Sequence, residues 1–159
     1  MEITIRKGKK KDIPAVLELI RELALYEKAP QEVTNTEMDM ERDGFGANPV
    51  FHLLVAVSED QVIGIAIYFI KYSTWKGKGV YLDDIVISES FRRNGVGKKL
   101  FDAVIADCVR LGAKQLHWQV LDWNEPAINF YRNYEASFDD EWINCKMTET
   151  QLLNFKKSG

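Results

Sequence analysis

The fold of this chain is decided by two neighbouring stretches, Gly79–Ile87 (GVYLDDIVI) and Arg92–Gly97 (RRNGVG). The first is rich in apolar and β-branched residues, which is typical of a buried strand. In the second, two glycines one residue apart let successive backbone N–H groups point at one spot, and a helix-like segment follows directly. Because a helix N-terminus adds partial positive charge there, the two stretches predict a site for phosphate or pyrophosphate.

The glycine loop lacks the features of two other nucleotide-binding loops. It has no Gly-Lys-Ser/Thr ending, which the phosphate loop of nucleotide hydrolases requires, and no first glycine of the dinucleotide-binding fingerprint. Cationic residues in and beside the loop suit an anion with several charges: Arg92, Arg93, Lys98 and Lys99. A tight surface turn before a helix is the alternative interpretation of the same residues.

Composition favours one globular domain over residues 1–159, because 46% of the residues are hydrophobic and 28% are charged. The formal net charge of -3 gives no support to nucleic-acid binding. Cys108 and Cys145 lie on apolar-patterned segments and are expected to be core residues in a reducing cytoplasm. No Cys/His cluster has zinc spacing, so no metal is expected. No signal peptide is expected, and the apolar run over 62–70 is too short to span a bilayer.

Hydrophobic spacing predicts alternating strands and helices. Strands are expected over residues 1–6, 51–57, 61–72, 80–88, 115–121 and 142–147, and helices after Asp12, within 26–48, from the glycine loop to Gly112, after Asn124 and after Thr148. The polar residues Ser58–Asp60 make a hairpin, whereas the crossover helix before 115–121 implies parallel pairing. We therefore expect an α/β fold with a mixed, mainly antiparallel central sheet, a central parallel βαβ pair and helices on both faces.

Polar residues are expected to cap three of these helices. Asp12 and Asn124 each stand directly before a helical pattern, where their side chains can accept hydrogen bonds from the first turn. Thr148 and Gln151 have the spacing of a capping box at the last helix. These caps predict where three helices begin.

Several blocks of sequence carry a resemblance to a known family. The loop Arg92–Gly97 and the preceding strand resemble the acyl-CoA-binding motif of GNAT-superfamily acetyltransferases, and Asn124–Tyr131 (NEPAINFY) resembles their downstream helix. Further blocks are similar to the diamine (spermidine/spermine) acetyltransferase group, and closest to its thialysine-acetylating branch: residues 44–46 (GFG), 72–77 (YSTWKG), 81–84 (YLDD) and 121–124 (LDWN). The resemblance covers nearly the whole chain and implies a GNAT-like fold and a homodimer.

The resemblance also implies where acetyl-CoA binds. Its pyrophosphate is expected at the loop and its flanks, and its pantetheine arm beside the backbone of the preceding strand. The residues concerned are Arg92, Arg93, Asn94, Gly95, Val96, Gly97 and Lys98 for the pyrophosphate, Ile85, Val86 and Ile87 for the arm, and Asn124 and Tyr131 on the downstream helix. A backbone N–H of the strand would hold the oxyanion that develops on the thioester carbonyl.

Two side chains are candidates for catalysis. The resemblance implies that the Tyr131 hydroxyl protonates the departing CoA thiolate, and a phenol with a pKa near 10 is protonated at neutral pH. Asp83 stands where the family usually has Glu, which is thought to receive the amine proton; the shorter Asp favours a water relay. Asp83 and Asp84 are adjacent on a strand, so we expect their side chains on opposite faces. Structural roles in the core for Tyr131 and at the strand end for Asp83 are the alternatives.

The acceptor side of the site is predicted from the same resemblance. Tyr26 and Glu27 are expected to flank the acceptor, Trp75 to shape the cleft, and Asp140 to lie near its far end. The loop after the first helix is acidic and would attract a cationic amine: Glu27, Glu32, Glu37, Asp39, Glu41 and Asp43. Polyamine-acetylating members carry Asp where this chain has Ser73, which favours an acceptor with an amino-acid end.

The chain departs from the family pattern at two further positions. Arg93 replaces a glycine of the loop, and Glu135 replaces a glycine after the downstream helix. The function expected is transfer of an acetyl group from acetyl-CoA to the primary amine of a small cationic acceptor. A protein lysine or N-terminal acetyltransferase and a CoA-binding regulatory module without turnover are the alternatives.

Overall fold

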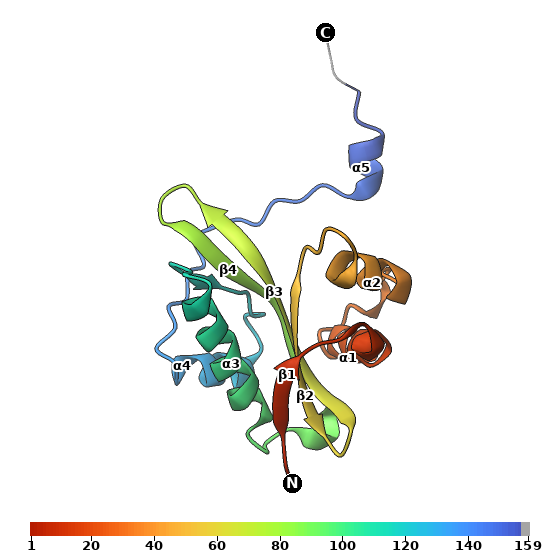
Figure 1. Ribbon diagram of the computed structural model, residues 1–159. Helices are drawn as coiled ribbons and strands as arrows, with labels where there is room; N and C mark the ends of the chain where they lie inside the picture. Colours follow the sequence, from red (N-terminus) through yellow and green to blue (C-terminus); the bar gives the residue numbers. More distant parts are fainter. Residues whose placement is uncertain (157–159) are drawn as a thin grey trace. The chain divides into compact units, whose positions relative to one another are not determined.

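The computed structural model describes residues 1–156 and divides the chain into two compact units, Met1–Leu121 and the residues from Asp122 onward (Figure 1). The first unit contains the sheet, and the second contains two short helices. Organisation as one domain over residues 1–159 stays a prediction. None of the helices within residues 1–156 has the length and apolar character needed to cross a membrane.

The first unit alternates between strands and helices. Its elements are β1 (Thr4–Lys7), α1 (Ile13–Tyr26), α2 (Glu37–Phe45), β2 (His52–Ser58), β3 (Gln61–Ser73), β4 (Gly77–Ile87), α3 (Val96–Arg110) and β5 (Leu116–His117). Single 3₁₀ turns lie between them at Lys10–Asp12, Pro30–Glu32 and Glu89–Phe91.

The five strands form one mixed sheet in the order β1-β2-β3-β4-β5, in which β4 and β5 are parallel and all other neighbours are antiparallel. The mainly antiparallel sheet and its parallel βαβ pair are thus confirmed, but the pair lies at one edge of the sheet within Met1–Leu121 and not at its centre as expected. The predicted hairpin joins β2 and β3 through Glu59 and Asp60, whose φ angles of 49° and 64° are typical of a two-residue turn.

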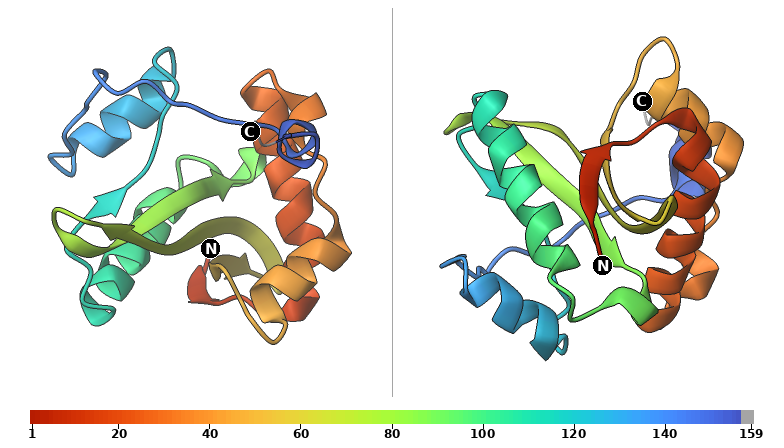
Figure 2. Two further views of the ribbon diagram at one scale, coloured as in Figure 1. Left: turned by 90° about the horizontal axis from the view of Figure 1, so that it is seen from above. Right: turned by 60° about the horizontal axis from the view of Figure 1, so that its bottom comes forward.

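Helices cover both faces of the sheet, as predicted (Figure 2). On one face, α1 and α2 lie over an apolar cluster to which Leu17, Val55 and Ile67 belong. On the other face, α3 approaches so closely that a Cβ added to Gly64 would lie 3.0 Å from Leu100 Cδ1. The sheet thus separates two layers, and the glycine loop enters α3 on one side while α1 and α2 cover the other.

Three expectations about strands and cysteines are wrong. The predicted strand over 115–121 reduces to the two residues of β5, and residues 142–147 form no strand. A strand needs a partner for its backbone groups, and apolar spacing alone does not supply one. Cys108 is buried as expected, but Cys145 is exposed because the strand that would bury it does not form.

Two of the three predicted caps are confirmed. In the second unit, Asn124 Oδ1 accepts from Ala127 N–H (3.4 Å) at the start of α4 (Glu125–Arg132), and Thr148 with Gln151 makes a complete capping box at α5 (Glu149–Leu153). Asp12 stands at the N-cap of α1 without a capping hydrogen bond. Its buried carboxylate instead binds the Arg6 guanidinium (2.7 Å), which lowers the pKa of Asp12.

Candidate active site

The glycine loop between β4 and α3 is held in a curled conformation by its own residues. Arg93 and Gly95 have φ angles of 64° and 75°, and the Asn94 side-chain amide donates to the carbonyl oxygens of Phe91 (3.2 Å) and Arg92 (3.2 Å). Gly95 is the N-cap of α3 and offers no side chain to the first-turn N–H groups. A Cβ on Gly95 would meet no atom within 4 Å, so the space beside this residue is open at the helix end, where a helix attracts anions.

The Arg92 side chain ties this loop to α1. Its Nε donates to the Ile87 carbonyl (3.1 Å), its guanidinium pairs with Glu22 (3.6 Å), and it lies 5.6 Å from the centre of the Tyr26 ring. Glu22 also accepts from the Glu89 backbone N–H (2.9 Å). Arg92 and Tyr26, expected on the donor and acceptor sides respectively, therefore contact each other and stabilise the connection between the loop and α1.

One edge of β4 carries no strand beside its last residues. Within Met1–Leu121, β5 pairs with β4 only at Val80 and Tyr81, whereas β3 pairs with β4 along nearly its full length. The backbone from Leu82 to Ile87 therefore has one edge free of strand pairing inside this unit. An extended ligand can hydrogen-bond to such an edge, which is where the pantetheine arm is expected at Ile85, Val86 and Ile87.

A β-bulge changes where the two adjacent aspartates point. Ile67 of β3 lies opposite Asp84 and Tyr68 lies opposite Leu82, so Asp83 is an extra residue on β4. Asp83 and Asp84 both line one cavity. The expectation that they lie on opposite faces is wrong, because the extra residue breaks the strict alternation of side chains along the strand.

The cavity lies between the sheet and the two helices α1 and α2. It has a volume of about 310 Å³, and its only carboxylates within the described chain are those of Asp83 and Asp84. The rest of its lining is apolar except for one amide: Leu17, Ile20, Asn35, Met40, Val50, Phe51, Ile67 and Phe69. Sequence reasoning missed Asp84 and these lining residues. A small molecule with an amine and a short aliphatic chain fits such a cavity.

The carboxylates here have perturbed pKa values. Burial, followed by the charges of Asp83 and Glu27, raises the pKa of Asp84 to about 7. Burial also raises the pKa of Asp83 and that of Glu27, which directly follows α1. The three groups hold a proton more readily than isolated carboxylates, and they attract a cation that relieves their mutual repulsion.

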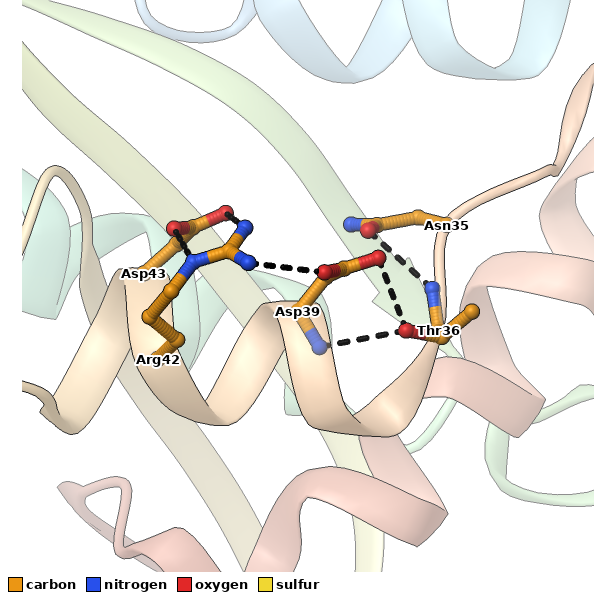
Figure 3. Close-up of polar contacts among 5 residues, drawn as sticks. All are labelled: Asn35, Thr36, Asp39, Arg42 and Asp43. Carbon is orange, nitrogen blue, oxygen red and sulfur yellow. Dashed lines mark hydrogen bonds and ion pairs between the residues drawn. The ribbon is translucent and has the colours of Figure 1, made fainter.

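Four of the six acidic residues expected in the loop after α1 lie on α2 itself, and two of them, Asp39 and Asp43, make polar contacts along this helix (Figure 3). Thr36 Oγ1 accepts from Asp39 N–H (3.1 Å), and Asn35 Oδ1 accepts from Thr36 N–H (3.1 Å). Arg42 pairs with both Asp39 (3.0 Å) and Asp43 (2.9 Å). These carboxylates stabilise α2, and of the acidic residues expected to attract the acceptor only Glu27 influences the cavity aspartates.

Ser73 and Trp75 lie at the tip of the β3–β4 hairpin. Ser73 Oγ accepts from the backbone N–H groups of Trp75 (3.2 Å) and Lys76 (3.1 Å), which fixes the turn. The Trp75 side chain is 84% exposed, and neither residue lines the cavity. Their expected contacts with the acceptor stay predictions. Lys98, expected near the pyrophosphate, pairs with Asp102 on α3 (2.6 Å).

The remaining predicted site residues belong to the second unit. Tyr131 lies on α4, with its ring 5.4 Å from that of Phe130, and Asp140 lies in an irregular segment after this helix. Asn124 caps α4 with its side-chain oxygen. Glu135, where the family has a glycine, has a φ of 57°. The left-handed backbone at both Arg93 and Glu135 explains why glycine suits these two positions.

Comparison with known proteins identifies relatives along most of the chain. The model of the acetyltransferase (GNAT) family matches residues 14–134. The thialysine N-epsilon-acetyltransferase of Bos taurus is 40% identical over 138 residues, which cover 82% of this chain and 81% of the relative. A spermidine/spermine N(1)-acetyltransferase-like protein of Homo sapiens is 31% identical over 160 residues, or 94% of this chain and 23% of the relative.

Solved structures share the fold. An integron cassette protein from the mobile metagenome of V. cholerae superposes with a TM-score of 0.77 at 23% sequence identity, and the match covers 96% of each chain. At this identity the likeness concerns the arrangement of strands and helices alone.

Proposed function

This chain belongs to the acetyltransferase (GNAT) family, and on that premise we propose that its cavity between the sheet, α1 and α2 binds the small cationic amine that accepts the acetyl group. The protein is an acyltransferase with acetyl-CoA as its cosubstrate. The observation that carries the proposal is that Asp83 and Asp84 line this cavity and lie in the part of β4 that has a free edge.

The residues of the first unit suit the donor. Acetyl-CoA supplies an activated acetyl thioester. The uncapped first turn of α3 and the open face of Gly95 suit its pyrophosphate, and the free edge of β4 suits its amide-containing arm. A backbone N–H of this edge can donate to the thioester oxygen as negative charge develops there. The individual donor-binding residues named above are part of this proposal.

The cavity carboxylates suit the acceptor. An alkylammonium with a pKa near 10 must lose a proton before its nitrogen can attack. Asp84, whose pKa is raised to about 7, accepts that proton more readily than an ordinary carboxylate does, and Asp83 and Glu27 supply additional negative charge. We assign proton removal to this group of carboxylates, with Asp84 as the main acceptor. Tyr131 of the second unit is the proposed proton donor to the thiolate.

An acceptor with an amino-acid end is the substrate we propose. The relative from Bos taurus is named for thialysine, and this chain carries the neutral Ser73 near the end of β3. With no carboxylate at this position, the hairpin offers less attraction to a second ammonium group of a polyamine. Thialysine or a lysine analogue is therefore favoured over spermidine.

A thiol-release assay with a panel of amines tests the function. Purified protein and acetyl-CoA are mixed with thialysine, lysine, ornithine, spermidine or a lysine-containing peptide, and the free thiol of CoA is measured over time. We expect the highest kcat/KM for thialysine. A clear preference for spermidine would contradict the proposed acceptor, and release of thiol with the peptide alone would favour a protein acetyltransferase.

Two further proposals concern assembly and location. We infer a homodimer from the family resemblance, and a cytoplasmic location from the two free cysteines, which suit a reducing compartment. Sedimentation equilibrium measures the mass of the assembly, and a monomer at micromolar concentration would contradict the dimer.

A further inference from the structure

A row of side chains continues from the acidic cavity along the same face of the sheet. Phe69 lines the cavity, and its ring lies 5.3 Å from that of Tyr81. Tyr81 pairs in turn with His117 of β5, and Lys71 follows Phe69 by two residues, so these side chains share one face. The row leads from the Asp83 and Asp84 bulge to a basic end.

The ammonium group of Lys71 is oriented but not neutralised. Its Nζ lies 3.4 Å from His117 Nδ1 and 5.5 Å from the centre of the Tyr81 ring. Burial and the charge of Lys71 lower the pKa of His117, so the imidazole is neutral at pH 7 and Nδ1 accepts a hydrogen bond from the ammonium. No ion pair joins Lys71 to a carboxylate within residues 1–156.

The spacing of the two charged ends suits a short bipolar molecule. In the register of β3 and β4, Asp84 lies opposite Ile67, and Lys71 lies four residues further along β3, roughly 13 Å away in backbone distance. The Lys71 side chain bends back over Tyr81 and shortens this gap. The six bonds between the side-chain nitrogen and the carboxylate carbon of a lysine-like molecule span roughly 7–8 Å.

We propose that Lys71, positioned by His117, binds the carboxylate of an amino-acid acceptor whose side-chain amine lies at Asp83 and Asp84. This assignment rests on the proposed function of the cavity and names the group that recognises the far end of the substrate. A diamine of the same length would place a second ammonium beside Lys71, where like charges repel. The basic end therefore selects amino acids over the corresponding diamines.

Two acceptors that differ only in the carboxylate test this subsite. Thialysine and bis(2-aminoethyl) sulfide have the same chain and the same two amines, but the sulfide lacks the carboxylate. We expect Lys71→Gln to raise the KM for thialysine about tenfold, because a charge-assisted hydrogen bond is lost, with little change in kcat. The KM for the sulfide should stay the same or fall.

A matched lysine serves as the control. Lys78 lies on the same hairpin but one residue from Gly79, the partner of Lys71, and so on the opposite face of the sheet. Lys78→Gln makes the same change of charge and should leave both KM values unchanged. His117→Leu removes the group that orients Lys71 and should raise the KM for thialysine by a smaller factor than Lys71→Gln does.

Two measurements separate this inference from the proposed function. Equal changes for both acceptors in Lys71→Gln, or no change for either, would overturn the carboxylate subsite while leaving acetyl transfer intact. If the wild-type protein releases no thiol with any of the amines, the function proposed for the cavity is wrong. Calorimetry of the two acceptors with the CoA complex then still tests the subsite, since Lys71→Gln should weaken the binding of thialysine and leave that of the sulfide unchanged. Circular dichroism establishes that each variant is folded.

Discussion

The glycine loop follows the free edge of β4 and the Asp83–Asp84 bulge lies at the start of that edge, and the two proposed sites would recognise their ligands by different means. The loop offers backbone N–H groups at the start of α3, and Gly95 contributes by having no side chain. The bulge offers two carboxylates whose pKa values are raised mainly by burial. Backbone groups suit a donor that is always the same, whereas side chains determine which acceptor is used.

This contrast also separates the effects expected from substitutions. Changes in the loop should alter the affinity for acetyl-CoA and leave the chemistry of the bound acceptor intact. Changes at the bulge should alter proton transfer and leave the affinity for acetyl-CoA intact. A substitution that moves both quantities together would break the distinction between the two regions.

The largest effect is expected at Asp84. Asp84→Asn keeps the size of the side chain but removes the proton acceptor, so kcat/KM should fall by about 10²- to 10⁴-fold. Steady-state kinetics with thialysine measure this loss, and calorimetry should show unchanged binding of acetyl-CoA. In the wild-type protein kcat/KM should rise with pH through an apparent pKa near 7, the value to which burial raises Asp84.

Asp83→Asn is the matched comparison for this prediction. Both aspartates line the cavity, but burial and two neighbouring carboxylates raise the pKa of Asp84, whereas burial alone raises that of Asp83. We expect the smaller loss of kcat/KM in Asp83→Asn. Wild-type turnover in Asp84→Asn together with an inactive Asp83→Asn would assign the proton acceptor to Asp83 instead.

The second effect in size is expected at Gly95. Gly95→Val places a branched side chain at a φ of 75°, on the open face that the pyrophosphate would approach, so the affinity for acetyl-CoA should fall by about a hundredfold or more. Gly112→Val is its control, since Gly112 has a φ of 71° and similar open space at the other end of α3. If both variants lose the same affinity for acetyl-CoA, the loss comes from backbone strain, and Gly95 does not lie at the pyrophosphate site.

The same contrast explains what the sequence could reveal. The glycine loop, the turn at Glu59 and Asp60, and the cap at Asn124 are local features, because the residues that determine each of them are neighbours in the chain. The bulge at Asp83 depends on the register between β4 and β3, which cannot be predicted from the sequence of either strand alone. The cavity was missed for this reason.

The failed strand has a related cause. Residues 142–147 have the apolar character of a strand, but a strand also needs a neighbour that satisfies its backbone groups. The crossover helix predicts that β4 and β5 are parallel, but it does not predict that they pair over only two residues. Sequence thus predicted the strand and the helix on either side of the glycine loop, and it did not predict the bulge or the short length of β5.

An intermediate effect on stability is expected from the raised pKa of Asp84. Below pH 4 both the folded and the unfolded chain hold the proton on Asp84, so Asp84→Asn should change little. Above pH 7 Asp84 is ionised in both states, but in the folded chain its charge is buried near Asp83. The wild-type protein therefore loses stability as the pH rises from about 4 to 7. At pH 8 Asp84→Asn should raise the free energy of unfolding by about 4 kcal/mol, the free energy that corresponds to the raised pKa of Asp84.

Urea denaturation at pH 4 and pH 8 measures this difference. A gain in stability at pH 8 that disappears at pH 4 is the expected result. A variant that is equally stabilised at both values would instead owe its stability to packing, and the acidic bulge would not store the electrostatic strain that an acceptor cation relieves.

The smallest effect is expected at Arg93, where the loop carries strain of its own. A side chain at a φ of 64° costs about 1 kcal/mol relative to glycine, so Arg93→Gly should raise the free energy of unfolding by roughly that amount. Arg93→Gln keeps the strained backbone and removes the charge. It should therefore leave the free energy of unfolding unchanged and modestly weaken the binding of acetyl-CoA.

Comparing the two Arg93 variants decides what the arginine contributes. If Arg93→Gly is more stable than Arg93→Gln while both bind acetyl-CoA equally weakly, the charge of Arg93 contributes to donor binding and the strained backbone only lowers stability. If Arg93→Gly binds acetyl-CoA as tightly as the wild-type protein, the backbone N–H groups alone hold the donor. The loop would then be wholly a backbone site, in the sharpest contrast to the side-chain site at the bulge.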